Sequence, residues 1–250
     1  MEKDSIKTYI CGCFLQMAIV VLFVLFFRFN GWSIDYSTIT GFTCIIVGGV
    51  SSAVWGAIVS VKYNNDSVHN IAREFFAIKK SAIFYPIILL LLIINFCSLF
   101  WGGIITVSKW YMPLLIFIKA IAFGGIEEIG WRYTLQPILD KKIGFIKATL
   151  CIFLLWGIWH YLFFYIDGSL QQIDMFGFYT GLLTNCFLLG MIYKKTESLW
   201  LCVFTHALIN TLSQIFEGGS YAAGYVAKVM VIVICVIFIL NREKISDEMK

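Results

Sequence analysis

Several polar side chains that could do chemistry lie inside long apolar stretches of the sequence. Glu127, Glu128 and Arg132 share one stretch, His160 lies in the next, and His206 and Asn210 lie in a third. An ionisable group at the centre of a membrane helix costs roughly 2.5–3.5 kcal/mol on insertion scales. Groups of this kind therefore indicate either mutual pairing or a functional site.

The spacing of the acidic pair predicts different roles for its two members. Glu128 and Arg132 are four residues apart, so on a helix they share a face, in the order that favours an ion pair. Glu127 is rotated by about 100° from Glu128. We therefore expect Arg132 to satisfy Glu128 and Glu127 to act on another group. The alternative is a buried ion-pair cluster that only fixes helix contacts.

The histidines and the amide complete a set of groups suited to hydrolysis. His206 and Asn210 are four residues apart and share a helix face. Alone, such a pair more often joins helices by hydrogen bonds. Together with Glu127 as general base and His160 as the residue that orients a water, His206 and Asn210 could donate to an oxyanion. No serine or cysteine is expected at the same level beside a histidine, so activated water fits better than a covalent nucleophile.

The same residues also form a zinc ligand set. Glu127, His160 and His206 could bind the metal, and a zinc-bound water would serve the same hydrolysis. The helical His-Glu-x-x-His signature is absent, so the ligands of such a site would come from different helices. The sequence leaves both possibilities open: hydrolysis without a cofactor and hydrolysis that depends on zinc.

The stretches that carry these residues are predicted to be membrane helices. The sequence is 60% apolar and 14% charged, which excludes an ordinary soluble domain, and its net charge of +4 is too small and scattered to indicate nucleic acid. Apolar runs near the roughly 20 residues that a bilayer requires lie at about 9–29, 39–61, 82–101, 112–137, 145–166, 174–193, 197–216 and 222–241. We predict an all-α, polytopic membrane helix bundle with about eight transmembrane helices. Residues 1–250 would form one transmembrane domain, with the motifs in a core at about 112–216.

Basic residues predict the orientation of this bundle. If the N-terminus is cytoplasmic, the cytoplasmic segments hold Lys3, Lys7, Lys62, Arg73, Lys79, Lys80, Lys141, Lys142, Lys147, Lys194, Lys195, Arg242, Lys244 and Lys250, whereas the outer side holds Arg28, Lys109 and Lys228. This asymmetry places both termini in the cytoplasm. The connection from Lys62 to Ser81 is predicted to be a helix on the cytoplasmic interface. Trp32, Trp101, Trp110 and Trp200 fall at span ends, where tryptophan anchors in the interface.

The candidate residues are also predicted to lie at a common depth. Counting from the nearest cytoplasmic lysine at 1.5 Å per residue, Glu127, His160 and His206 lie about 21, 20 and 17 Å into the membrane. These depths are close to the midplane of an apolar core about 30 Å thick. A common depth is what a single site requires.

The motifs resemble those of the CAAX prenyl protease and bacteriocin-processing (CPBP, or Abi) family. That family carries Glu-Glu-x-x-x-Arg, Phe-x-x-x-His and His-x-x-x-Asn on separate membrane helices. Glu127-Glu128-Ile-Gly-Trp-Arg132 matches the first motif, and His206-Ala-Leu-Ile-Asn210 matches the third. His160 matches the second, but Trp156 stands where the family usually has phenylalanine. This departure puts the shape of the substrate pocket in doubt more than catalysis.

The resemblance implies intramembrane endoproteolysis of membrane-associated peptides or proteins. Glu127 and His160 would activate water, His206 and Asn210 would bind the oxyanion, and membrane lipid would surround the protein; the metal requirement stays open. Short loops favour a bacterial member in the plasma membrane over a eukaryotic one in the endoplasmic reticulum membrane. Two alternatives are a non-catalytic membrane scaffold or bacteriocin-immunity factor and, third, a small-solute transporter.

Overall fold

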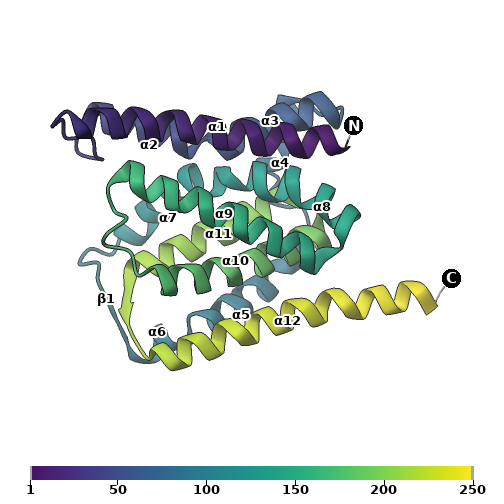
Figure 1. The fold of residues 1–250 in the computed structure, drawn as a ribbon. Coiled ribbons are helices and arrows are strands. Elements are labelled where there is room, and N and C mark those ends of the chain that lie inside the picture. The colour runs from purple at the N-terminus through teal and green to yellow at the C-terminus, as the bar shows by residue number, and fades with distance from the viewer. Residues whose placement is uncertain (1, 249–250) are drawn as a thin grey trace. The chain divides into compact units, whose positions relative to one another are not determined.

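The computed structural model describes residues 2–248, with the side chains of residues 3–241, and is almost entirely helical (Figure 1). Its α-helices are α1 (Glu2–Phe29), α2 (Ile39–Gly49), α3 (Ser51–Tyr63), α4 (Val68–Phe75), α5 (Tyr85–Asn95), α6 (Cys97–Gly102), α7 (Met112–Phe123), α8 (Gln136–Ile143), α9 (Phe145–Asp167), α10 (Met175–Thr196), α11 (Leu199–Ile215) and α12 (Tyr221–Glu248). The remaining elements are η1 (Ala82–Phe84), β1 (Gly103–Ile105), η2 (Gly125–Glu127), η3 (Ile129–Leu135) and β2 (Phe216–Gly218). Lys250 lies outside the described residues, as do the side chains of Arg242 and Lys244.

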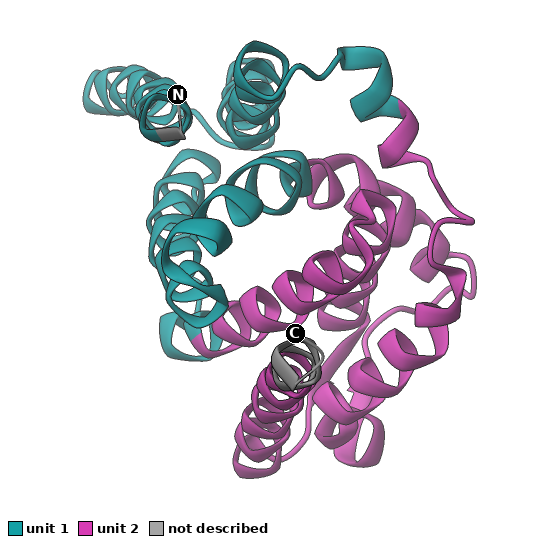
Figure 2. Ribbon diagram, turned by 90° about the vertical axis from the view of Figure 1, so that its right-hand side faces the viewer, with its two compact units in different colours: residues 1–72, 127–179 teal, residues 73–126, 180–250 magenta. Residues whose placement is uncertain are grey.

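The helices form two compact units, each assembled from two separated stretches of the chain (Figure 2). Unit 1 contains Met1–Ala72 and Glu127–Tyr179. Unit 2 contains Arg73–Ile126 and Thr180–Lys250. The candidate residues Glu127 to Arg132 and His160 therefore belong to unit 1, and His206 and Asn210 belong to unit 2. The single domain predicted for residues 1–250 stays a prediction.

Unit 1 is held together by packing of its long helices and by an arginine at their ends. α1 packs along α3, and α2 and α8 pack against α9. Arg28, in the last turn of α1, donates hydrogen bonds from Nη1 to the Tyr165 carbonyl oxygen (2.6 Å) and from Nη2 to the Ile166 carbonyl oxygen (3.0 Å). These carbonyls lie in the last turn of α9, where a cation is favoured by the helix dipole. Arg28 therefore ties the end of α1 to the end of α9.

In unit 2 both ends of α11 are fixed. α7 packs along α11, and α12 packs against α5 and α6. The Ser198 hydroxyl caps the start of α11 by accepting a hydrogen bond from the Leu201 backbone N–H (3.3 Å). At the other end β2 follows α11 directly and pairs with β1 in an antiparallel ribbon that sets Ile105 opposite Phe216. The helix that carries His206 and Asn210 is thus anchored at both termini.

The apolar surface and the helix lengths identify a membrane protein. Within the described residues, five helical segments are long and apolar enough to cross a membrane: Lys3–Phe29, Ile39–Tyr63, Phe145–Asp167, Met175–Thr196 and Tyr221–Asn241. They coincide with the first, second, fifth, sixth and eighth predicted spans. α12 exposes a helical stripe of apolar side chains that includes Val226, Met230, Val233 and Ile237, as a lipid-facing helix does. The all-α membrane bundle is confirmed, and the count of about eight spans and the cytoplasmic termini stay predictions.

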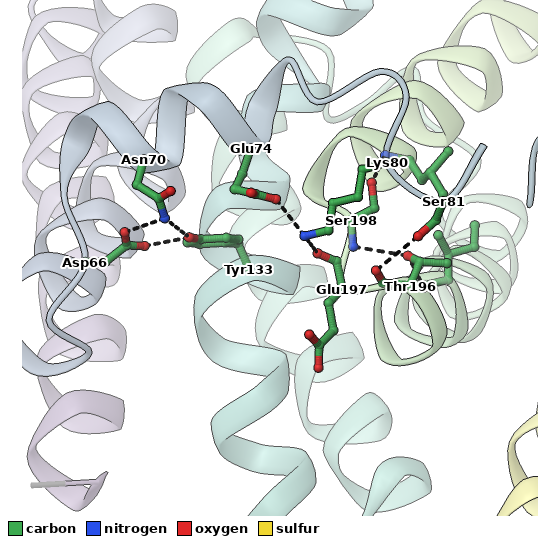
Figure 3. A network of polar contacts seen from close by, with 11 residues as sticks. Asp66, Asn70, Glu74, Lys80, Ser81, Tyr133, Thr196, Glu197 and Ser198 are labelled. Atoms are coloured by element: carbon green, nitrogen blue, oxygen red, sulfur yellow. Dashed lines mark hydrogen bonds and ion pairs between the residues drawn. The ribbon is translucent and has the colours of Figure 1, made fainter.

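The cytoplasmic connection after the second predicted span differs from the predicted interfacial helix. Instead of one helix across Lys62–Ser81, the structure has the end of α3, a loop, and the short helix α4. The Ser67 hydroxyl starts α4 by accepting from the Asn70 backbone N–H (3.1 Å). After α4, Lys80 Nζ binds both Glu74 Oε2 (2.7 Å) and the Glu197 carbonyl oxygen (2.6 Å), which holds the chain in a turn (Figure 3). Specific polar contacts, which periodicity does not reveal, therefore shorten the helix.

One of the predicted tryptophan anchors is buried. Trp32, Trp101 and Trp110 are 63%, 93% and 90% exposed, as interfacial anchors should be. Trp200 is only 8% exposed, and its Nε1 donates a hydrogen bond to the Tyr85 hydroxyl (2.7 Å). The prediction for Trp200 was wrong because a partner on α5 satisfies its N–H group inside unit 2.

Candidate active site

The segment that carries the acidic motif is not a regular α-helix. The sequence predicts one span over 112–137, but α7 ends at Phe123 and is followed by the 3₁₀ turn η2 and the π-helix η3. The prediction of a continuous span was therefore wrong. π-Helical turns inside α-helices occur frequently at functional sites. Glu127 ends the 3₁₀ turn, and Arg132 lies in the middle of the π-helix.

Hydroxyl groups from unit 1 satisfy carbonyl oxygens of this irregular backbone. The Ser52 hydroxyl, on α3, donates to the Glu127 carbonyl oxygen (3.2 Å) and itself accepts from the Tyr9 hydroxyl (2.9 Å). The Thr134 hydroxyl donates to the carbonyl oxygen of Ile129 (2.8 Å). Each buried carbonyl that lacks a regular helical partner would otherwise cost free energy. These hydroxyl groups therefore help to fix the backbone conformation around Glu127.

Close contact between backbones allows α3 to lie against this segment. A Cβ atom added at Gly56 would lie 2.6 Å from Gly130 Cα, and one added at Gly130 would lie 2.2 Å from Ser52 Oγ. No real side chain fits at such distances. Glycine at both positions is therefore required for the observed approach of α3 to η3.

The predicted Glu128–Arg132 ion pair is present and fully buried. Arg132 Nε lies 3.5 Å from Glu128 Oε2, and neither side chain is exposed. The guanidinium of Arg132 also lies over the Trp156 ring, 4.3 Å from its centroid. Within the described residues the nitrogens of Arg132 make no hydrogen bond, so the carboxylate and the aromatic face supply its electrostatic stabilisation.

Trp156 also contacts the two residues predicted to activate water. Its indole Nε1 donates a hydrogen bond to Glu127 Oε2 (2.7 Å). Its carbonyl oxygen lies 2.9 Å from His160 Nδ1, and the centroids of the Trp156 and His160 rings are 5.2 Å apart. If Nδ1 carries the proton and donates it to this carbonyl, Nε2 is the basic nitrogen of the neutral imidazole. Glu127 is 6% exposed, whereas His160 is half-buried.

In unit 2, the two residues of the third motif converge on Gly124, the residue that directly follows α7. A Cβ atom added at Gly124 would lie 2.4 Å from Asn210 Nδ2 and 3.1 Å from His206 Nε2. His206 is buried, and Asn210 is half-buried. The side-chain nitrogens of both residues therefore face the same short piece of backbone, as the shared helix face predicts. Two donors that converge in this way can bind one acceptor atom.

A comparison with known protein families identifies the segment that holds all of these residues. Residues 108–212 match the family described as Type II CAAX prenyl endopeptidase Rce1-like. A curated relative, CAAX prenyl protease 2 of Methanococcus maripaludis, is 26% identical over 119 residues, which are 44% of this chain and 43% of the relative. These two matches support the predicted CPBP family for residues 108–212, called the CPBP segment below. The match spans less than half the length of the relative.

Every candidate residue lies inside the CPBP segment. Within it, Glu127, Glu128, Arg132 and His160 are brought together around Trp156 in unit 1. His206 and Asn210 are brought together at Gly124 in unit 2. Their catalytic roles stay predictions.

Two further residues of the CPBP segment shape the site, and the sequence contains only weak signals for them. Trp156 is an aromatic residue in a phenylalanine position, and the signal for its role is the indole N–H that phenylalanine lacks. Gly124 was not singled out. Its signal is the Gly124-Gly125 pair immediately before the acidic motif, since adjacent glycines often mark a close approach of the backbone to another group.

The zinc alternative receives no direct support from the geometry. Among the described residues, no group of three or more histidine, cysteine, aspartate or glutamate side chains is arranged to hold a metal ion. Glu127 and His160 are candidate ligands in unit 1, and His206 is one in unit 2. Zinc dependence stays an open alternative that chelation can test.

Proposed function

We propose that this protein is an intramembrane endopeptidase that hydrolyses peptide bonds of membrane-associated peptides or proteins. The observation that carries the proposal is the contact of Glu127 and His160 with the same residue, Trp156, inside a buried part of unit 1. The CPBP segment and the name of the relative support the same reaction class. A buried acid and a more accessible imidazole that share one neighbouring residue are suited to proton transfer.

In the proposed reaction, Glu127 takes a proton from a water molecule that His160 orients. The resulting hydroxide attacks the carbonyl carbon of the scissile peptide bond and forms a tetrahedral oxyanion. The C–N bond then breaks, and the proton held by Glu127 passes to the leaving amine. The products are a carboxylic acid and an amine, so one water is consumed for each peptide bond.

We assign His206 and Asn210 to the oxyanion. Their side-chain nitrogens converge on Gly124, and two fixed N–H donors stabilise negative charge more strongly in the transition state than in the substrate. Only Gly125 and Ile126 separate Gly124 from Glu127 in the sequence.

Glu128 and Arg132 are proposed to position the site rather than to react. Their charges oppose each other at 3.5 Å in a fully buried environment, so neither is proposed to transfer protons. Arg132 also lies against Trp156, the residue that holds Glu127. The ion pair would therefore fix the π-helix and the aromatic ring next to the general base.

The substrate class follows from the proposed family relationship. Because the relative is named as a CAAX prenyl protease, a prenylated peptide in a bilayer is the first substrate to test. Short membrane-associated bacterial peptides are the second. Cleavage would take place in a membrane, with the bacterial plasma membrane favoured over the endoplasmic reticulum membrane.

Reconstituted protein tests the proposal directly. The full chain in liposomes should cleave an internally quenched, farnesylated CAAX peptide or a panel of hydrophobic bacterial peptides. Glu127→Gln and His160→Ala should each lower kcat by about 10²–10⁴-fold, the usual contribution of a general base or acid. Thermal unfolding in detergent should show that both variants remain folded.

Matched controls are available on the same chain. Glu217 on β2 and His69 on α4 are exposed, so Glu217→Gln and His69→Ala repeat the same chemical changes away from the proposed site and should retain activity. Full activity of folded Glu127→Gln or His160→Ala would refute the mechanism. Cellular function of both variants at normal abundance, without any cleavage by wild-type protein, would favour the scaffold or immunity alternative.

A further inference from the structure

Trp156 contacts three polar residues of unit 1 through three different parts of its structure. The indole N–H donates to the Glu127 carboxylate (2.7 Å), the ring face lies 4.3 Å from the Arg132 guanidinium, and the carbonyl oxygen lies 2.9 Å from His160 Nδ1. Trp156 itself is only 1% exposed. Its orientation is therefore fixed by its surroundings, and it can fix its partners in turn.

The three contacts differ in how far they depend on tryptophan. Any residue at position 156 supplies the backbone carbonyl, and any aromatic ring supplies a face for Arg132, although tryptophan binds a cation best. Of the aromatic residues phenylalanine, tyrosine and tryptophan, only tryptophan has a ring N–H, and phenylalanine has no donor at all. The hydrogen bond to Glu127 therefore depends on the one residue that departs from the usual phenylalanine of the motif.

We infer that Trp156 is a positioning residue that holds the Glu127 carboxylate in the orientation required of the general base. This inference rests on the proposed function. A carboxylate has two oxygens, and an N–H bound to Oε2 directs Oε1 toward the other side of the group. The hydrogen bond thereby restricts rotation of the Glu127 carboxylate, which would otherwise misalign it for proton transfer. Phenylalanine at this position would need another donor for the same task.

Other tryptophans in unit 1 provide matched controls. Trp159 is also 1% exposed, and its Nε1 donates to the Ser51 hydroxyl (2.8 Å) rather than to Glu127. Trp131 is fully buried, and its Nε1 makes no hydrogen bond within the described residues. The Trp159→Phe variant thus removes a buried indole hydrogen bond to a different acceptor and keeps an aromatic ring beside His160. Trp131→Phe removes an indole N–H that has no acceptor among the described residues and keeps an aromatic ring beside Trp156.

The first test measures kinetics in liposomes with the farnesylated peptide. Trp156→Phe should lower kcat by about 10- to 100-fold, the factor that corresponds to a hydrogen bond to a charged group. KM should stay unchanged because the indole contacts Glu127 and not the substrate. Trp159→Phe and Trp131→Phe should retain the wild-type kcat. Unchanged kcat in folded Trp156→Phe would overturn the inference, as would equal losses in all three variants.

The second test does not require activity. The chain contains eight tryptophans, so protein with ¹⁵N-labelled indole nitrogens in detergent gives a small set of N–H signals that the three phenylalanine variants assign. Glu127→Gln should shift the Trp156 signal and leave that of Trp159 in place. An unshifted Trp156 signal would show that the hydrogen bond is absent. If the Trp156 signal shifts but the wild-type protein cleaves no peptide, the hydrogen bond to Glu127 is present and only the proposed function is refuted.

Discussion

The backbone of Gly124 lies so close to the side-chain amide of Asn210 that no Cβ atom fits between them. The imidazole of His206 borders the same backbone, so both proposed oxyanion donors depend on an absent side chain. Gly124 does not have a positive φ: its φ is −86°. The requirement for glycine is thus one of space rather than of backbone conformation.

Gly124→Ala should therefore impair catalysis more than folding. The added methyl group would displace Asn210 Nδ2, and a displacement of about 1 Å at reacting groups can cost on the order of 10²-fold in rate. Gly181→Ala is the control, because it lies in α10 of the same unit and its Cβ would meet only Lys228 Cε at 3.9 Å. Peptide cleavage and thermal unfolding of both variants provide the comparison. Equal activity of the two would argue against the proposed role of Asn210 and His206.

Removal of one partner of the Glu128–Arg132 pair should destabilise unit 1 strongly. Arg132→Met leaves Glu128 as a buried charge that has lost its cation, which typically costs about 3–5 kcal/mol. The double variant Glu128→Gln/Arg132→Met removes both charges and should recover part of this loss. Thermal unfolding of the three proteins in the same detergent measures the coupling. A double variant less stable than Arg132→Met would contradict the assignment of the pair as mutually neutralising.

Chelation distinguishes the two ways of activating water. In the proposed mechanism Glu127 and His160 suffice, so dialysis against a chelator should leave peptide cleavage intact. Metal analysis of the dialysed protein must confirm that less than one zinc per chain remains. Loss of activity that added zinc restores would instead support the zinc alternative, in which Glu127, His160 and His206 are the candidate ligands.

A carboxylate outside the predicted spans should show a measurable pH dependence. The hydroxyl and the backbone N–H of Ser37 both donate to Asp35 Oδ1, and these hydrogen bonds lower the pKa of Asp35 from its ordinary value. Its contribution to stability is therefore present above the pKa of the unfolded chain and is lost as the pH falls through the pKa of the folded state. Ser37→Ala should raise the pKa of Asp35, as a titration of its ¹³C-labelled carboxyl group would show. An unchanged titration midpoint would contradict the hydrogen-bond assignment.

Local spacing predicted the parts of the site that depend on one helix face. The i,i+4 relationship brings Arg132 to Glu128 and sets His206 and Asn210 on one side of α11, and both relationships hold in the structure. The membrane class followed from composition and from the length of apolar runs, as the long helices confirm.

Features that arise from packing between distant segments were not predictable in the same way. The Trp156–Glu127 hydrogen bond joins residues that are 29 positions apart, and no periodicity encodes it. The carbonyl oxygen of Glu127, at the end of the 3₁₀ turn, accepts a hydrogen bond from Ser52, which in turn contacts Tyr9 on another helix. Trp200 was misassigned for the same reason, because Tyr85 is its distant partner.

The π-helix between Ile129 and Leu135 makes the local shape of this segment sensitive to length. A π-helical turn holds about one residue more than an α-helical turn, so deletion of a single residue here would permit an ordinary α-helix. Loss of the wide turn would absorb most of the roughly 100° rotation that a deletion causes in an α-helix, so the flanking residues would stay nearly in register. The wide turn that holds Arg132 would nevertheless be lost, although no side chain of the site had been altered. Chain length, and not only residue identity, is therefore part of what encodes this site.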